Sequence, residues 1–226
     1  MKIGFFGDSF CAEEYSRSFK YQTYISMLKT HYNAEIVHLG QGGSSASDLI
    51  LLQLKPFIDK NKVPDICIFC WTEPHRLFHR TVRNLNYASA NESSNEWVKN
   101  SKIWKAAQDY YEHLWDHEYT QLQYQALLEH TDNNILPILP KSTKLIHMWS
   151  FGKMLEDPKL NNNDYHYKWK HGVTVTPSLT AISLIDSNFE EFSNNNGPNH
   201  FTTKDKNEKV FKLVCDAIDN YEDLCI

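Results

Sequence analysis

The fold is decided by residues 2–9, which read Lys-Ile-Gly-Phe-Phe-Gly-Asp-Ser. The apolar run is typical of a buried β-strand, and Gly7 ends it two residues before Ser9. If a helix follows, the strand belongs to an α/β sheet, and its carboxyl end lies at the edge where open sheets bind ligands. A serine there is a candidate nucleophile, with backbone amides close by to receive an oxyanion. The same residues also suit a helix cap, because Asp and Ser accept hydrogen bonds from helix amides.

Strand and helix patterns alternate along the rest of the chain. Helical spacing of apolar residues over 21–32 is followed by a strand pattern over 34–39, a helix that Ser45 or Ser47 caps and that runs from Asp48 toward Pro56, and an apolar strand over 66–71. A further strand is expected at 144–150, then a loop over 155–172 and a last helix capped by Thr202 or Thr203. Strands that are apolar throughout indicate a parallel sheet covered on both faces. We therefore expect a single α/β domain over residues 1–226.

A polar stretch rich in Trp and Tyr interrupts this alternation at about residues 84–134. It lies between the third strand and the next one, and we interpret it as a helical insertion. Two roles remain open for it: a lid or pocket wall over the edge of the sheet, or an oligomer contact. The oligomeric state itself does not follow from the sequence.

Composition narrows the partners and the compartment. The net charge of −5 and the lack of a block rich in Lys and Arg argue against nucleic acid as a partner. No segment resembles a signal peptide or a membrane span, so we expect a cytoplasmic or virion-associated protein with no membrane partner. The five cysteines show no framework spacing, which favours reduced thiols. Cys67 and Cys70 form a C-x-x-C pattern, but they lie in an apolar run, so we predict a buried strand and not a redox site.

Four separated blocks follow the first, second and third predicted strands and precede the last helix, in this order: Gly7-Asp8-Ser9, Gly43, Trp71-Thr72-Glu73-Pro74 and Asn199-His200-Phe201-Thr202. Their order and positions relative to the strands resemble the SGNH (GDSL-type) serine hydrolases. In that family the blocks supply, in turn, a nucleophilic serine, a glycine amide, an asparagine side chain and a histidine base. The resemblance implies a flavodoxin-like three-layer α/β/α sandwich and an esterase or acyl-hydrolase activity.

Applied to this chain, the resemblance makes Ser9 the nucleophile and His200 the general base. The amides of Ser9 and Gly43 would hold the oxyanion. It implies no cofactor and no metal. The implied substrate is a small-molecule or glycan ester, and the aromatic insertion is compatible with an acylated carbohydrate.

Two blocks depart from the family pattern. Thr72 stands where the family has its oxyanion-hole asparagine, and its shorter hydroxyl would have to donate that hydrogen bond. Glu73 and Arg76 follow, either to bind a polar or anionic substrate or to pair with each other. With Asp8 they are the predicted substrate-binding residues.

The last block lacks the orienting acid, because Gly197 occupies the position three before His200. A backbone carbonyl or a carboxylate from elsewhere can orient a base, and Asp186, Asn196 and Asn199 are possible substitutes.

This departure motivates a second hypothesis, a catalytically reduced domain that serves as a glycan-binding or virion assembly component. A third hypothesis makes Asp8, Glu73, His75 and His200 a metal-dependent phosphoesterase site. His113 and His117 have i, i+4 spacing that also suits a metal, but we expect them on a solvated face.

Overall fold

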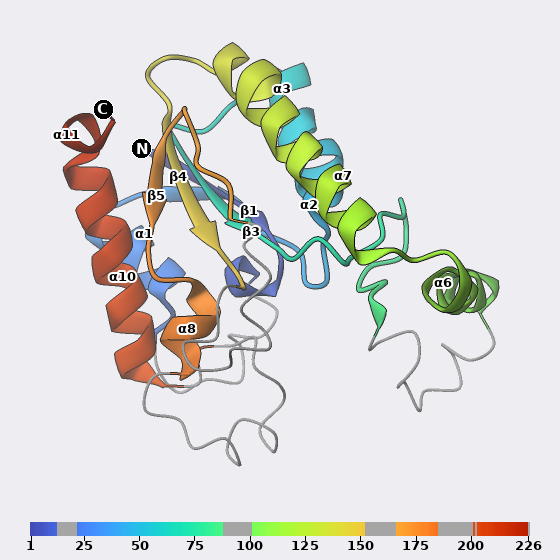
Figure 1. Ribbon diagram of the computed structural model, residues 1–226. Coiled ribbons are helices and arrows are strands. Elements are labelled where there is room, and N and C mark those ends of the chain that lie inside the picture. The colour runs from blue at the N-terminus through green and yellow to red at the C-terminus, as the bar shows by residue number, and fades with distance from the viewer. Residues whose placement is uncertain (13–21, 88–100, 152–165, 185–200, 202, 226) are drawn as a thin grey trace.

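A five-stranded parallel sheet lies at the centre of the computed structural model (Figure 1). The structure describes residues 1–12, 22–87, 101–151, 166–184, 201 and 203–225. The strands lie in the order β2-β1-β3-β4-β5. Their bounds are β1 (Lys2–Gly7), β2 (Glu35–His38), β3 (Ile66–Trp71), β4 (Lys144–Trp149) and β5 (Val173–Val175). This is the strand order of flavodoxin-like doubly wound sheets.

Helices cover both faces of the sheet, which confirms the predicted three-layer α/β/α architecture. One face is covered by α1 (Tyr24–His31), α8 (Leu179–Leu184) and α10 (Lys204–Asp219), which α11 (Tyr221–Leu224) follows. The other is covered by α2 (Ala46–Asp48), η3 (Leu49–Leu54), α3 (Lys55–Asp59) and α7 (His117–His130). The short turns η4 (Thr131–Ile135) and η5 (Leu136–Ile138) then lead toward β4. None of the described helices is long and apolar enough to cross a membrane.

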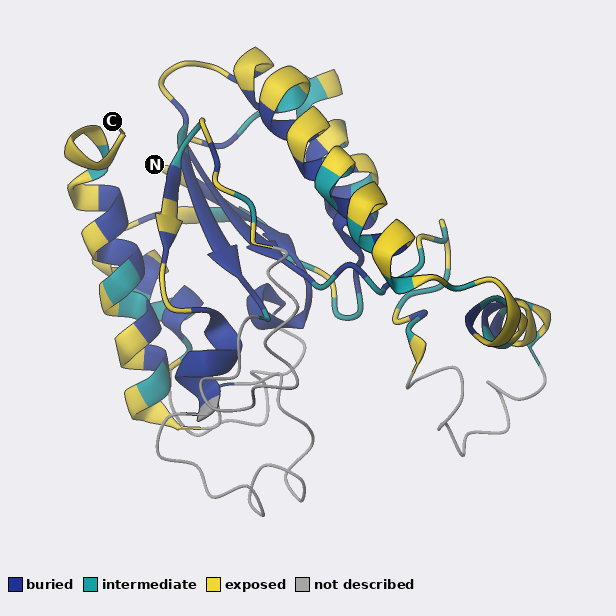
Figure 2. Cartoon of the chain, viewed as in Figure 1, coloured by how far each residue is buried: buried dark blue, intermediate teal, exposed yellow. Residues whose placement is uncertain are grey.

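Alternate strand residues supply the two halves of the core. Phe5 faces the layer of α1 and α10, whereas its neighbour Phe6 faces the layer of α2 and α7. Figure 2 shows the central strands buried along almost their whole length. Cys67 and Cys70 are fully buried free thiols on β3, one in each half of the core. The predicted buried strand is therefore confirmed at the C-x-x-C pattern.

The helix that follows the second strand continues past Pro56, where we expected it to end. Ser45 caps it in a reciprocal arrangement with Asp48, and the chain stays helical to Asp59. Proline lacks an amide hydrogen and crowds the preceding turn. Here the turn before it, η3, is a wide π-helical one, which accommodates the proline within the helix.

The predicted helical insertion contains two helices that behave differently. Tyr124 and Leu128 of α7 are buried in the core, so α7 belongs to the sandwich. In contrast, α6 (Lys102–His113) forms a separate small core in which Trp104 and Tyr111 pack around Leu85. Figure 1 shows α6 standing away from the sheet, beyond the end of α7. The insertion thus extends the carboxyl edge of the sheet on the α7 side.

Candidate active site

Ser9 lies at the carboxyl end of β1, in a tight turn. The strand ends at Gly7, whose φ of +151° suits only glycine and where a Cβ would lie 2.3 Å from the carbonyl oxygen of Cys70. Ser9 then begins the 3-10 turn η1 (Ser9–Cys11), for which Asp8 provides the N-cap. The serine is 7% exposed. The sequence therefore folds locally into both of the alternatives weighed for it, a serine at the sheet edge and an Asp-capped helical turn.

Asp8 is fully buried beneath this turn. Its Oδ1 accepts hydrogen bonds from the Phe10 amide (3.1 Å) and from the Ser150 hydroxyl (2.9 Å), which lies at the end of β4. Its Oδ2 has no hydrogen-bond partner in the described part of the chain. Burial raises the pKa of the Asp8 carboxyl, and the positive charge of Arg76 opposes that rise. Asp8 thus joins the ends of two strands at the base of the site.

The loop after β2 is fastened to the Ser9 turn by backbone hydrogen bonds. The Gly40 amide donates to the carbonyl of Cys11 (2.9 Å), and the Gln41 amide donates to the carbonyl of Gly7 (3.0 Å). The buried Gln53 amide reinforces this contact, because it bonds both backbone groups of Gly7 at 2.8 Å. The loop that leads to Gly43 therefore lies beside the Ser9 turn, because β1 and β2 are neighbours in the sheet.

Gly43 adopts a backbone conformation that favours glycine. Its φ is +74°, and a Cβ there would come within 2.7 Å of the Asn84 Cβ. The Gly43 carbonyl accepts a hydrogen bond from the Asn84 amide (2.9 Å). Neither the Gly43 amide nor the Ser9 amide donates to a backbone carbonyl among the described residues. The role of both amides as oxyanion donors, which the resemblance implies, stays a prediction.

Thr72 directly follows β3 and is almost fully buried. The Tyr124 hydroxyl of α7 donates a hydrogen bond to its carbonyl oxygen, while its own Oγ1 has no partner among the described residues. The Thr72 hydroxyl lies near enough to Asp8 to lower the pKa of that carboxyl. Its place in an oxyanion hole remains a prediction.

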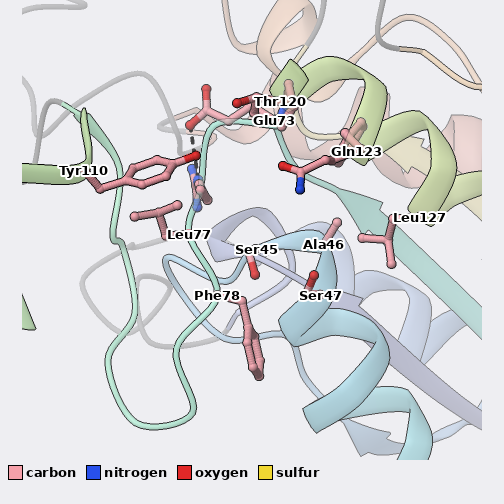
Figure 3. Close-up of a pocket in the computed structure, with 13 residues that line it drawn as sticks. Ser45, Ala46, Ser47, Glu73, Leu77, Phe78, Tyr110, Thr120, Gln123 and Leu127 are labelled. Atoms are coloured by element: carbon pink, nitrogen blue, oxygen red, sulfur yellow. Dashed lines mark hydrogen bonds and ion pairs between the residues drawn. The ribbon is translucent and has the colours of Figure 1, made fainter. Parts of the chain in front are cut away.

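Glu73 and Arg76 pair with each other, which is one of the two roles considered for them. Arg76 Nε lies 3.1 Å from Glu73 Oε1, and Arg76 Nη1 donates to the Ser44 carbonyl at 3.4 Å. The guanidinium also lies 5.2 Å from the centre of the Phe151 ring. Both side chains line a pocket beside the site (Figure 3). The pairing is therefore established, and the binding of a substrate by these two residues stays a prediction.

The last sequence block lies partly outside the described residues. His200, Gly197 and the candidate orienting residues Asp186, Asn196 and Asn199 all belong to the part of the chain that is not described. Phe201 and Thr203 are described, and Thr203 caps α10 through a hydrogen bond that its Oγ1 accepts from the Lys206 amide. The predicted helix cap is thus assigned to Thr203.

Phe201 packs against the Ser9 turn. Its ring centre lies 5.4 Å from that of Phe10 and 5.9 Å from that of Tyr24. Asn207 of α10 donates to the Phe201 carbonyl (3.2 Å) and accepts from the Tyr24 amide (2.9 Å). The Tyr24 hydroxyl in turn donates to the Phe10 carbonyl (2.9 Å). The residue after Ser9 and the residue after His200 are therefore held together.

The three proposed metal ligands that the structure describes contact other groups. Asp8 bonds Ser150, Glu73 pairs with Arg76, and the His75 ring lies 5.3 Å from that of His117. No group of three or more His, Cys, Asp or Glu side chains suited to a metal ion occurs within the described ranges. His75 is partly buried, and burial lowers its pKa.

Several residues of the site escaped the sequence analysis. Ser150 is the last residue of the strand predicted at 144–150, so its position at the sheet edge was a usable signal. Gln53 is the one polar residue in the run Leu49–Leu54, which also marks it as a buried residue with a bonding role. Comparisons of the chain with protein-family models, curated proteins and solved structures found no match.

Proposed function

We propose that the protein is a serine esterase of the SGNH type, in which Ser9 is the nucleophile and His200 the general base. The contact between the Phe10 and Phe201 rings carries this proposal. Consecutive Cα atoms lie about 3.8 Å apart, so the anchored Phe201 limits how far residue 200 can lie from the Ser9 turn. A nucleophile and its base have to come within hydrogen-bond reach of each other.

The proposed reaction uses groups of this chain alone. His200 takes the proton of the Ser9 hydroxyl while the serine oxygen bonds to the acyl carbon of an ester. The amides of Ser9 and Gly43 stabilise the resulting oxyanion, and His200 returns the proton to the departing alcohol. Water then attacks the acyl-enzyme with His200 as base, which releases the acid and restores Ser9.

The two departures from the family pattern predict slow turnover. Loss of one oxyanion donor typically costs on the order of 100- to 1,000-fold in turnover. Without an aspartate at position 197, a carbonyl or another carboxylate would have to orient the base. A reagent that reports a single reaction of the serine is therefore a better first test than steady-state turnover.

Labelling with a fluorophosphonate, followed by intact-mass spectrometry, tests the proposal. The native protein should gain one adduct, and Ser9→Ala and His200→Ala should gain none. Ser101→Ala is the matched control, since Ser101 precedes α6, and it should label like the native protein. Circular dichroism establishes that each variant is folded. Absence of an adduct on the folded native protein would refute the serine mechanism.

A second candidate function is that of a binding domain with an SGNH-like fold and reduced catalytic activity, which serves as a glycan-binding or virion assembly component. The low exposure of Ser9 and the glycine at position 197 favour it. It predicts that the folded native protein does not label and that Ser9→Ala leaves ligand binding unchanged.

A further inference from the structure

A pocket of about 320 Å³ lies beside the candidate active site, at the carboxyl edge of the sheet (Figure 3). Its floor is the start of α2, one wall is α7, and the chain after β3 closes the opposite side. Arg76 joins the pocket to the site. It lines the pocket and donates a hydrogen bond to the Ser44 carbonyl, and its positive charge lowers the pKa of the Asp8 carboxyl. A ligand in the pocket would therefore lie next to the loops that hold Ser9 and Gly43.

The charge in the pocket is balanced within the protein. Arg76 is paired with Glu73 at 3.1 Å, and its side chain is 3% exposed, whereas that of Glu73 is 28% exposed. A ligand thus meets the carboxylate more readily than the guanidinium. This arrangement disfavours an anionic ligand and favours a neutral one that donates hydrogen bonds to Glu73.

Three further polar groups in the pocket are unused. The Ser47 hydroxyl, the Tyr110 hydroxyl and the Gln123 side-chain amide line it and form no hydrogen bond among the described residues. In Figure 3 they come from different walls, with Tyr110 and Gln123 on opposite sides of the pocket and Ser47 below. Groups that converge in this way suit a ligand with several hydroxyls spaced around a ring.

The lining also offers apolar surface, from the aliphatic side chains of Leu77 and Leu127 and from aromatic rings. The Phe78 ring is 37% exposed and, with Tyr110, offers aromatic surface to the C–H face of a ligand. A fatty acyl chain in the same place would cover polar groups of Ser47 and Gln123 without pairing them. Each buried polar group left unpaired opposes binding.

We propose that this pocket binds an uncharged, hydroxyl-rich ring, the size and chemistry of a sugar unit. Its role as the place where the carbohydrate part of the substrate binds rests on the proposed function, whereas the binding itself does not. The insertion is then a pocket wall, since Tyr110 of α6 and Gln123 of α7 contact the ligand. This assigns specificity to two residues outside the four sequence blocks.

Saturation-transfer NMR tests the proposal with a panel of named probes. The neutral probes are glucose, galactose, N-acetylglucosamine and their β-linked dimers, glucuronate is the anionic probe, and octanoate is the acyl probe. At least one neutral sugar should bind, with glucuronate and octanoate weaker. Gln123→Leu should weaken that binding about five- to tenfold, because one or two hydrogen bonds are lost.

Tyr110→Phe should weaken binding by a smaller factor, and Tyr119→Phe is its matched control, since Tyr119 is 58% exposed and does not line the pocket. Three results would overturn the proposal: no neutral sugar binds, glucuronate or octanoate binds best, or Gln123→Leu binds the sugar as the native protein does. Fluorophosphonate labelling separates the two proposals. Labelling without sugar binding refutes only the pocket, and sugar binding without labelling refutes only the esterase.

Discussion

Replacing Phe10 and Phe201 by leucine, singly and together, tests the contact that joins the Ser9 turn to the last sequence block. The rings are 4% and 5% exposed, and their centres are 5.4 Å apart. Phe→Ala at a buried site costs about 3–5 kcal/mol, a large part of the ~5–15 kcal/mol that stabilises a domain. Leucine keeps most of the apolar volume, so we expect each single change to cost about 1–2 kcal/mol.

The double-mutant cycle isolates the contact between the two rings. An aromatic pair of this geometry contributes about 0.5–1.5 kcal/mol beyond the area that it buries, and this is the coupling we expect. Phe57 lies on the opposite face of the sheet, so a Phe57→Leu and Phe201→Leu cycle provides the control. Its coupling should stay within about 0.5 kcal/mol of zero.

Urea denaturation followed by fluorescence measures the four free energies of unfolding in each cycle. The rate of fluorophosphonate labelling in Phe201→Leu gives a second readout, and it should fall because the residue that anchors the His200 segment is altered. Equal coupling in the two cycles would refute the contact. If Phe201→Leu is measurably less stable but labels at the native rate, the contact between the rings does not help to position His200, and that part of the proposal is refuted.

Two other positions give predictions of a different kind. Gly43→Ala should destabilise the protein by about 1–3 kcal/mol, because the φ of residue 43 is +74° and the new Cβ would meet Asn84. The same change should slow fluorophosphonate labelling. An unchanged urea midpoint would contradict this prediction. Burial lowers the pKa of His147 to about 3, compared with about 6.5 in an unfolded chain. Between these pH values the unfolded state binds more protons, so His147 makes the unfolding free energy fall by about 1.4 kcal/mol per unit as the pH decreases from 6.5. His147→Gln should make that dependence shallower in urea denaturation at successive pH values, and an identical slope would refute the buried neutral imidazole.

The elements that the sequence predicted well are those whose pattern comes from burial on both sides. The strand predicted at residues 66–71 is β3, and every residue of it is buried. In contrast, β5 has only three residues, with Thr174 exposed between two buried valines, and lies near a stretch that we predicted to be a loop. Its pairing with β4 over residues 146–148 is a tertiary effect that a three-residue pattern does not reveal. The same holds for α8, whose residues are buried by α10 and the sheet.

The candidate site was predictable in position but not in its contacts. Parallel strands bring their carboxyl ends to one edge, which is why Thr72 lies near Asp8 and the loop after β2 is bonded to the turn after β1. The bond between Asp8 and Ser150 joins residues 142 positions apart, and no local pattern encodes it. In contrast, Glu73 and Arg76 have i, i+3 spacing, so their pairing could be considered from the sequence. The pocket wall that Gln123 provides depends on how α7 packs, which the sequence does not show.

A crystal structure of the protein after reaction with the fluorophosphonate tests the roles of Ser9 and His200 most directly. We expect phosphorus bonded to Ser9 Oγ, the phosphoryl oxygen within hydrogen-bond distance of the Ser9 and Gly43 amides, and a His200 nitrogen facing the Ser9 oxygen. Phosphorus on another side chain, or an unmodified Ser9 with His200 turned away from it, would refute the serine mechanism.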